Sequence, residues 1–297
     1  MRIGRLHAMH PPRLTIQRIA VIAIGLFLLV ACQKAEMRYS ATLDRASLMQ
    51  LPFPGWKADG EGSVQPVDLS ATAGKQSKAD ATQMRAKVTP LYVVRLDDTH
   101  AALLTQALPV DDDNTPQSCH ACSGNIGAYF FEHGTAGWRL GARQDAVANS
   151  GVQGNIGQTQ ITKLADGHFA LTAEWGSCWQ GYCGSWLVLI GLQADRATLL
   201  HAGIPLSVDN DGAFGACGEL DKPTTATADP DLHECLDVHS QWKIQDSRLL
   251  INFEGRVSKP DPDGKLLPTQ KIAQQTAYAI TPGLLTLVRG ANPVPGF

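Results

Sequence analysis

The stretch from Gly167 to Leu192, GHFALTAEWGSCWQGYCGSWLVLIGL, constrains the fold of this chain more than any other part of the sequence. A β-hairpin with a two-residue turn at Gln180-Gly181 would place Cys178 opposite Cys183. In such a hairpin this second pair from the turn is not hydrogen-bonded. Its Cα atoms then lie about 4.5 Å apart, which is within the reach of a disulfide. The sequence therefore predicts a hairpin closed by a cross-strand disulfide.

The same register brings four aromatic side chains to one face of the hairpin. Trp175 faces Trp186, and Trp179 faces Tyr182. We expect Trp175 and Trp186 to pack in the core, whereas Trp179 and Tyr182 flank the turn. Exposed aromatic rings on a rigid tip suit ligand or partner binding, so Trp179 and Tyr182 are the candidate binding residues. The alternative is that the tip folds back onto the domain.

The return strand of this hairpin is apolar on both faces. Trp186, Val188 and Ile190 alternate with Leu187 and Leu189. A strand that is apolar on both sides is buried on both sides, so we expect residues 186–192 to form a central strand of a sheet.

Short β-rich runs separated by turn signals continue through the rest of the chain. Asp166-Gly167 is a strong turn signal, and the 28 glycines and 17 prolines suit many tight turns. With no convincing long helix after the N-terminus, the pattern predicts an all-β fold of antiparallel sheets. A sandwich or barrel-like arrangement is favoured over a partial propeller, because no self-similarity of about 40 residues is present.

The N-terminus differs in character from the rest of the chain. Four arginines and no acidic residues precede a run of twelve apolar residues, Ile19–Val30. Such a run is too short to cross a membrane comfortably but suits the helical, apolar part of a signal peptide. It ends in Leu29-Val30-Ala31-Cys32.

This ending resembles the lipobox of bacterial lipoprotein precursors. The resemblance implies that residues 1–31 are a signal peptide, that cleavage occurs before Cys32, and that Cys32 carries diacylglycerol on its thiol and an acyl chain on its amine. Several acyl chains on one residue make a stable membrane anchor. Gln33, where an aspartate would indicate the inner membrane, favours the periplasmic face of the outer membrane. An uncleaved signal anchor is the alternative, and the resemblance covers only the leader.

The charge after the leader argues against one class of partner. Removing the four leader arginines from 25 basic residues leaves 21 against 28 acidic residues, a net charge of −7. Nucleic-acid binding needs concentrated lysine and arginine, so we exclude it. The expected partners are the membrane, through the lipid on Cys32, and an envelope protein or glycan.

Six cysteines remain after Cys32, and an even number in an exported protein indicates disulfides. The hairpin geometry pairs Cys178 with Cys183. Close spacing favours Cys119 with Cys122, which leaves Cys217 with Cys235 by elimination. Residues 32–87 are expected to be a lipid-anchored segment and flexible tether with a short helix at Thr42–Gln50, and residues 88–297 the β domain.

Several motifs allow a second interpretation. Cys119-His120-Ala121-Cys122 has redox spacing, but no βαβ unit surrounds it, so we favour a structural disulfide. A four-cysteine zinc site with Cys178 and Cys183 is the alternative. His233, Cys235, Asp237 and His239 alternate along a predicted strand and are interpreted as its polar face.

Nothing in the sequence assigns a catalytic residue, a metal or a cofactor. The acidic stretches Asp209–Gly212 and Asp261–Gly264 fit turns better than calcium loops. The Gly-x-Ser-x-Gly motif of a nucleophilic serine does not occur. The leading hypothesis is a non-enzymatic, lipid-anchored binding or structural β domain of the cell envelope. The alternatives are an envelope hydrolase whose site combines distant residues, and a metal-binding lipoprotein.

Overall fold

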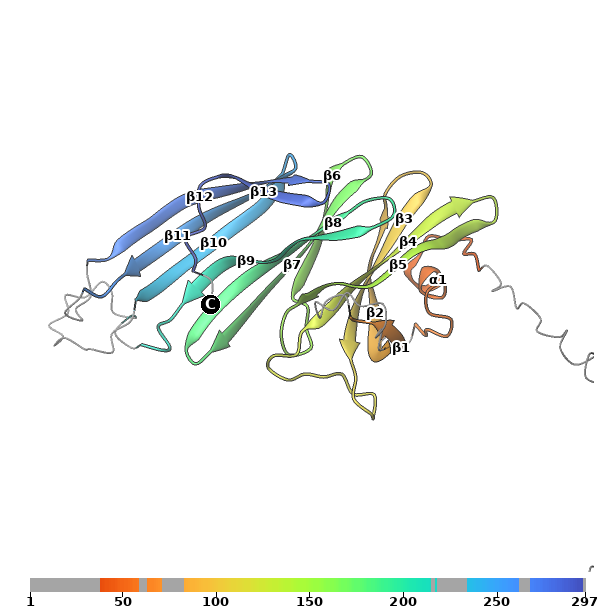
Figure 1. Cartoon of the computed structure of the whole chain (residues 1–297), viewed down its shortest axis with the longest axis horizontal. Coiled ribbons are helices and arrows are strands. Elements are labelled where there is room, and N and C mark those ends of the chain that lie inside the picture. Colours follow the sequence, from red (N-terminus) through yellow and green to blue (C-terminus); the bar gives the residue numbers. More distant parts are fainter. Residues whose placement is uncertain are drawn as a thin grey trace, which may run out of the picture. The chain divides into compact units, whose positions relative to one another are not determined.

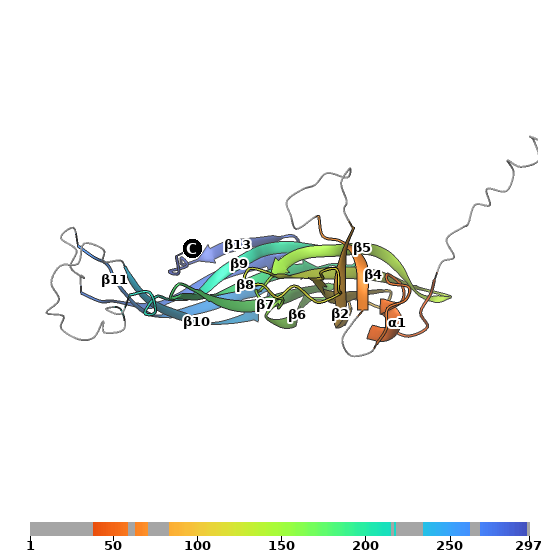
Figure 2. The ribbon, with the colours of Figure 1, turned by 90° about the horizontal axis from the view of Figure 1, so that it is seen from below.

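The structure is a computed structural model that describes residues 38–58, 63–70, 83–214, 217, 234–261 and 268–295. One compact unit runs from Arg38 to Phe297. The described residues contain one short helix, α1 (Arg45–Met49), and thirteen strands in two antiparallel sheets (Figure 1, Figure 2). The predicted all-β antiparallel fold is confirmed. The predicted signal peptide and Cys32 lie outside the described residues.

Both sheets follow the order of the chain, so neighbouring strands within a sheet are consecutive in the sequence. The first sheet contains β1 (Ser63–Asp68), β2 (Gln83–Arg95), β3 (His100–Pro109), β4 (Gly124–Gly134) and β5 (Gly137–Ser150). The second contains β6 (Gln158–Ala165), β7 (His168–Trp179), β8 (Tyr182–Leu192), β9 (Ala197–Asp209), β10 (Cys235–Gln245), β11 (Arg248–Ser258), β12 (Gln270–Thr281) and β13 (Leu284–Arg289).

Strand β8 is buried on both faces, as its sequence predicts. Val188 and Ile190 pack in a core cluster with side chains of β3 and β4 from the other sheet. Leu187 and Leu189 pack in a different cluster with side chains of β9, β10 and β11. The hairpin of β7 and β8 therefore connects the core between the two sheets with the core that the eight-stranded sheet forms within itself.

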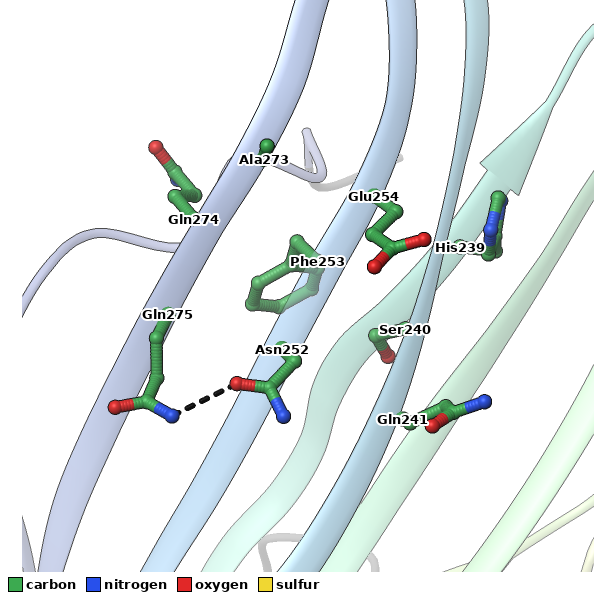
Figure 3. A pocket seen from close by; sticks show the side chains of 9 residues that line it. All are labelled: His239, Ser240, Gln241, Asn252, Phe253, Glu254, Ala273, Gln274 and Gln275. Carbon is green, nitrogen blue, oxygen red and sulfur yellow. Dashed lines mark hydrogen bonds between the residues drawn. The ribbon is translucent and has the colours of Figure 1, made fainter.

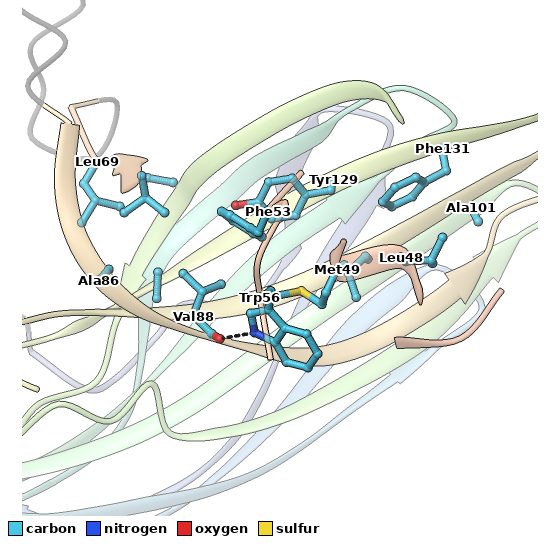
Figure 4. Packing of buried hydrophobic residues seen from close by; sticks show 14 of the residues in the cluster. Leu48, Met49, Phe53, Trp56, Leu69, Ala86, Val88, Ala101, Tyr129 and Phe131 are labelled. Atoms are coloured by element: carbon cyan, nitrogen blue, oxygen red, sulfur yellow. Dashed lines mark hydrogen bonds between the residues drawn. The ribbon is translucent and has the colours of Figure 1, made fainter. Parts of the chain in front are cut away.

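The compact unit begins at Arg38, earlier than the boundary near Val88 that the sequence predicts. Part of the predicted tether covers the first sheet, where α1 and the turn after it bury Leu48, Met49, Phe53 and Trp56 (Figure 4). The indole Nε1 of Trp56 donates a hydrogen bond of 3.0 Å to the carbonyl oxygen of Val88. Leu48 and Met49 lie on α1, which confirms the short helix that the sequence predicts at Thr42–Gln50. Phe53 and Trp56 pack from the turn after it, where no strand or helix period applies, so periodicity missed these two.

A buried carboxylate connects this covering segment with the sheet. Asp145 on β5 accepts hydrogen bonds from the hydroxyl of Tyr129 at 2.8 Å and from the backbone N–H of Asp68 at 2.8 Å. The guanidinium of Arg143 donates to Asp145 through Nε at 2.7 Å and to the carbonyl oxygen of Pro52 through Nη1 at 3.0 Å. β1, β4, β5 and the segment after α1 thus share one polar network.

All three predicted disulfides are confirmed. Cys178 and Cys183 face each other across the hairpin with Cα atoms 4.0 Å apart, and Cys119–Cys122 and Cys217–Cys235 are the other two pairs. Because each of these cysteines is bonded to its partner, the four-cysteine zinc alternative is excluded.

Candidate functional site

The hairpin tip has the register that the sequence predicts. Trp175 pairs with Trp186 and Trp179 pairs with Tyr182. Gln180 and Gly181 have φ values of 49° and 86°, the positive values that the tightest two-residue turns require. A Cβ on Gly181 would lie 2.2 Å from backbone atoms of Gly212 and Ala213, so glycine is also needed for the close approach of the tip to the loop after β9.

The four aromatic rings have different environments. Trp175 and Trp186 stack with ring centroids 4.6 Å apart, and they are half-buried rather than fully in the core. Tyr182 packs edge-on against Phe214 at 5.8 Å, so this side of the tip folds back onto the domain. Trp179 remains 62% exposed. Of the two candidate binding residues, Trp179 is the one presented to solvent.

Trp179 does not stand alone on the surface. Its ring lies 4.9 Å from the ring of His120, centroid to centroid, with the planes tilted by 45°. His120 belongs to the Cys119–Cys122 disulfide segment between β3 and β4, far from the hairpin in sequence. Sequence reasoning missed this contact, because no periodicity relates two loops of different sheets. The only available signal is that each residue lies next to a disulfide with a short loop.

A concave surface of about 650 Å³ lies beside this aromatic pair and reaches β9 and β10. Its wall includes the disulfide Cys178–Cys183 and several groups that can donate or accept hydrogen bonds. The polar lining side chains are His120, Gln153, Ser177, Ser207, Asp209, Asp237 and His239.

The carboxylates of this surface come from neighbouring strands, because Asp209 on β9 pairs with Asp237 on β10. The Nε of Arg256 donates a hydrogen bond of 3.0 Å to Asp237. The pKa of nearby Asp211 is raised, first by burial and then by the charges of Asp209 and Asp237, while Arg256 lowers it. The surface is thus acidic, with one arginine partly balancing the charge.

The β9–β10 junction depends on side chains, since only two residue pairs join these strands. Asn210 in the turn after β9 donates through Nδ2 to the carbonyl oxygen of Glu234 at 2.7 Å and accepts from the N–H of Leu236 at 2.8 Å. Asp209 accepts from the N–H of Asp211 at 2.9 Å. The contact between Asp209 and Asp211 belongs to the turn predicted for residues 209–212, whereas Asn210 joins that turn to the start of β10. Most of Asp261–Gly264 lies outside the described residues.

A second hollow continues along the outer face of β10, β11 and β12 (Figure 3). His239 lines both hollows, and Gln275 donates a hydrogen bond of 2.8 Å to Asn252 across β11 and β12. Asp237 and His239 therefore lie on a polar strand face, as the sequence predicts. Cys235 is buried in its disulfide, and His233 lies outside the described residues.

The groups near Trp179 include one histidine and one serine that lie close together. The Nε2 of His120 lies 3.5 Å from the Oγ of Ser177, the long limit of a hydrogen bond. Within the described ranges no carboxylate is hydrogen-bonded to His120, as a Ser–His pair would need to orient it. Over the same ranges no three His, Cys, Asp or Glu side chains are close enough to hold a metal ion. The alternative that this chain is an envelope hydrolase stays a prediction.

Comparison with protein-family models, with curated proteins and with solved structures gave no match. Across the described part of the chain, no helix has the length and apolar character needed to cross a bilayer.

Proposed function

We propose that this chain is a non-enzymatic binding protein of the bacterial cell envelope, anchored through lipid on Cys32, and that it contacts its ligand through Trp179. The observation that carries the proposal is the 62% exposure of Trp179 on a hairpin tip that the Cys178–Cys183 disulfide closes, next to His120 of the Cys119–Cys122 segment. An exposed tryptophan held in one orientation loses little conformational entropy on binding, which is why such residues dominate interface energetics.

The chemistry beside Trp179 favours a glycan as ligand. An indole face offers an apolar platform, and the neighbouring surface offers carboxylates, hydroxyls and imidazoles that can hydrogen-bond to sugar hydroxyls. Its volume of about 650 Å³ lies within the usual range of ligand sites, roughly 300–1,000 Å³. The acidic side chains Asp209 and Asp237 act as acceptors for several donors at once. An envelope protein is the alternative partner.

Replacing Trp179 with alanine should weaken binding to soluble fragments of the cell-wall glycan about tenfold or more, which corresponds to about 1.4 kcal/mol. Isothermal titration with purified fragments measures this. Trp179→Phe should retain part of the affinity because it keeps a ring. Tyr39→Ala is the matched control, since Tyr39 is another exposed aromatic residue, 41% accessible and outside the surface described above.

Unchanged glycan affinity of the Trp179→Ala variant would refute the site. If the wild-type chain binds no glycan fragment but captures an envelope protein, and Trp179→Ala loses that capture, then the partner is the protein. In all three variants, correct formation of the three disulfides, checked by mass spectrometry, shows that the fold is intact.

The anchor has its own test. Cys32→Ser should abolish incorporation of an alkyne-labelled fatty acid, because the thiol that carries diacylglycerol is gone. Gln33→Asn is the control and should remain labelled. Labelling that persists in Cys32→Ser would contradict lipidation at this residue.

A further inference from the structure

A separate cavity lies at the opposite end of β7 and β8 from the Trp179 tip. Four hairpin turns surround it: those that join β6 to β7, β8 to β9, β10 to β11 and β12 to β13. Its volume is about 270 Å³. The lining side chains used below are Leu164, His168, Phe169, Leu192, Ser247 and Ile280.

The interior of this cavity is lined by apolar side chains, and the hydroxyl group of Ser247 is already hydrogen-bonded within the protein. Leu192 and Ile280 are buried, and Leu164 and Phe169 are half-buried. The hydroxyl of Ser247 donates to the carbonyl oxygen of Leu164 at 3.2 Å, so it is already engaged by the protein. A cavity lined in this way does not hold water well and favours an apolar occupant.

The polar groups of this cavity lie next to an exposed turn, where the polar head group of a bound amphiphile would lie. The half-buried side chains of His168 and Gln193 belong to the lining, next to the exposed turn at Asp166. The Nδ1 of His168 lies 3.0 Å from the carbonyl oxygen of Asp166, a contact that orients the ring. This arrangement is complementary to a molecule with a hydrocarbon tail and a polar end.

An apolar strip continues from the cavity along the edge strand β13. Leu285 on β13 pairs with Ile280, which lines the cavity, so the two side chains lie on one face of the sheet. Leu287, two residues further on and therefore on the same face, is 50% exposed. This strip favours a long, flexible occupant over a compact ring.

We propose that this cavity binds the hydrocarbon chain of an amphiphile, with part of the chain in the cavity and the remainder along β13. An apolar cavity of about 150 Å³ is enough to bind benzene, so a space of 270 Å³ accommodates several methylene groups. This inference concerns a different site from the one near Trp179 and does not depend on it.

The test uses the mature chain from residue 32 with Cys32→Ser, exported to the periplasm so that its disulfides form. Titration with 11-(dansylamino)undecanoic acid should give a saturable increase in fluorescence with one probe per chain. Leu164→Trp, which fills the cavity, should weaken binding at least tenfold. Leu199→Trp is the matched control, because Leu199 on β9 is 40% exposed and does not line the cavity. Trp179→Ala should bind the probe normally.

The absence of saturable binding to the wild-type chain would overturn the proposal, as would equal affinity in Leu164→Trp. Should Leu164→Trp not fold, Ala165→Trp offers a second substitution in the lining at an exposed position. Competition between the dansyl probe and unlabelled ligands shows where the bound hydrocarbon chain comes from. Displacement by dodecanoate alone indicates a free fatty acid, and displacement also by phosphatidylethanolamine–phosphatidylglycerol vesicles indicates a membrane lipid. Either displacement supports the site.

Discussion

Replacing Asp145 with alanine is expected to lower the free energy of unfolding by about 3 kcal/mol. The side chain of Asp145 is 7% exposed and accepts from a phenol, a guanidinium and a backbone N–H. The pKa of Tyr129 is raised, first by burial and then by the charge of Asp145, so the phenol stays protonated and donates. Without the carboxylate, these buried donors lose their acceptor, and each such loss costs about 1–3 kcal/mol.

The expected loss lies at the lower end of the range for buried ion pairs because Arg143 is not fully buried. Its side chain is 37% exposed, so water compensates part of its charge once Asp145 is removed. Urea denaturation measures the change. Asp145→Asn, which keeps one acceptor oxygen, should cost less than Asp145→Ala. Asp98→Ala on the exposed β2–β3 turn should change stability by about 0.5 kcal/mol or less. An Asp145→Ala variant within 1 kcal/mol of wild type would contradict the role given to the network.

This network illustrates what the sequence does not contain. Arg143 and Asp145, two residues apart on a strand, look like an exposed ion pair. They are covered because the segment with Phe53 packs over them, and Arg143 lies 5.0 Å from the Phe53 ring centroid. That packing joins residues about ninety positions apart in the chain. No local pattern predicts it, and the same holds for Phe53 and Trp56, which belong to the compact unit although they precede the β domain expected at residues 88–297.

The hairpin shows the opposite case. Its register follows from a two-residue turn and the alternation of β7 and β8, both of which are local. Since neighbouring strands within each sheet are consecutive in the sequence, much of the architecture rests on such local pairing. The candidate site also combines a feature that local sequence predicts with one that it does not. Exposure of an aromatic ring at the tip was predictable, whereas the contact between Trp179 and His120 joins two sheets and required the structure.

Removing the Cys217–Cys235 disulfide, with both residues changed to alanine, should destabilise the domain by about 3 kcal/mol. This bond closes a loop with a sequence separation of 18, against 5 for Cys178–Cys183. Because the entropy that a cross-link removes from the unfolded chain grows with loop length, removing Cys178–Cys183 should cost less, about 2 kcal/mol. Urea denaturation of the two double variants in parallel compares them directly.

The Cys217–Cys235 disulfide lies at the start of β10, so its removal should also affect ligand binding. Cys235 is the first residue of β10, which pairs with β9 through only two residue pairs, one of them Asp209 with Asp237. Loss of the disulfide should therefore loosen the edge that carries both carboxylates and weaken glycan binding, even where the fold persists. Cavity binding of the dansyl probe should be unaffected, because the turns that surround it lie at the other end of the strands. A Cys217/Cys235 variant no less stable than the Cys178/Cys183 variant would contradict the dependence on loop length.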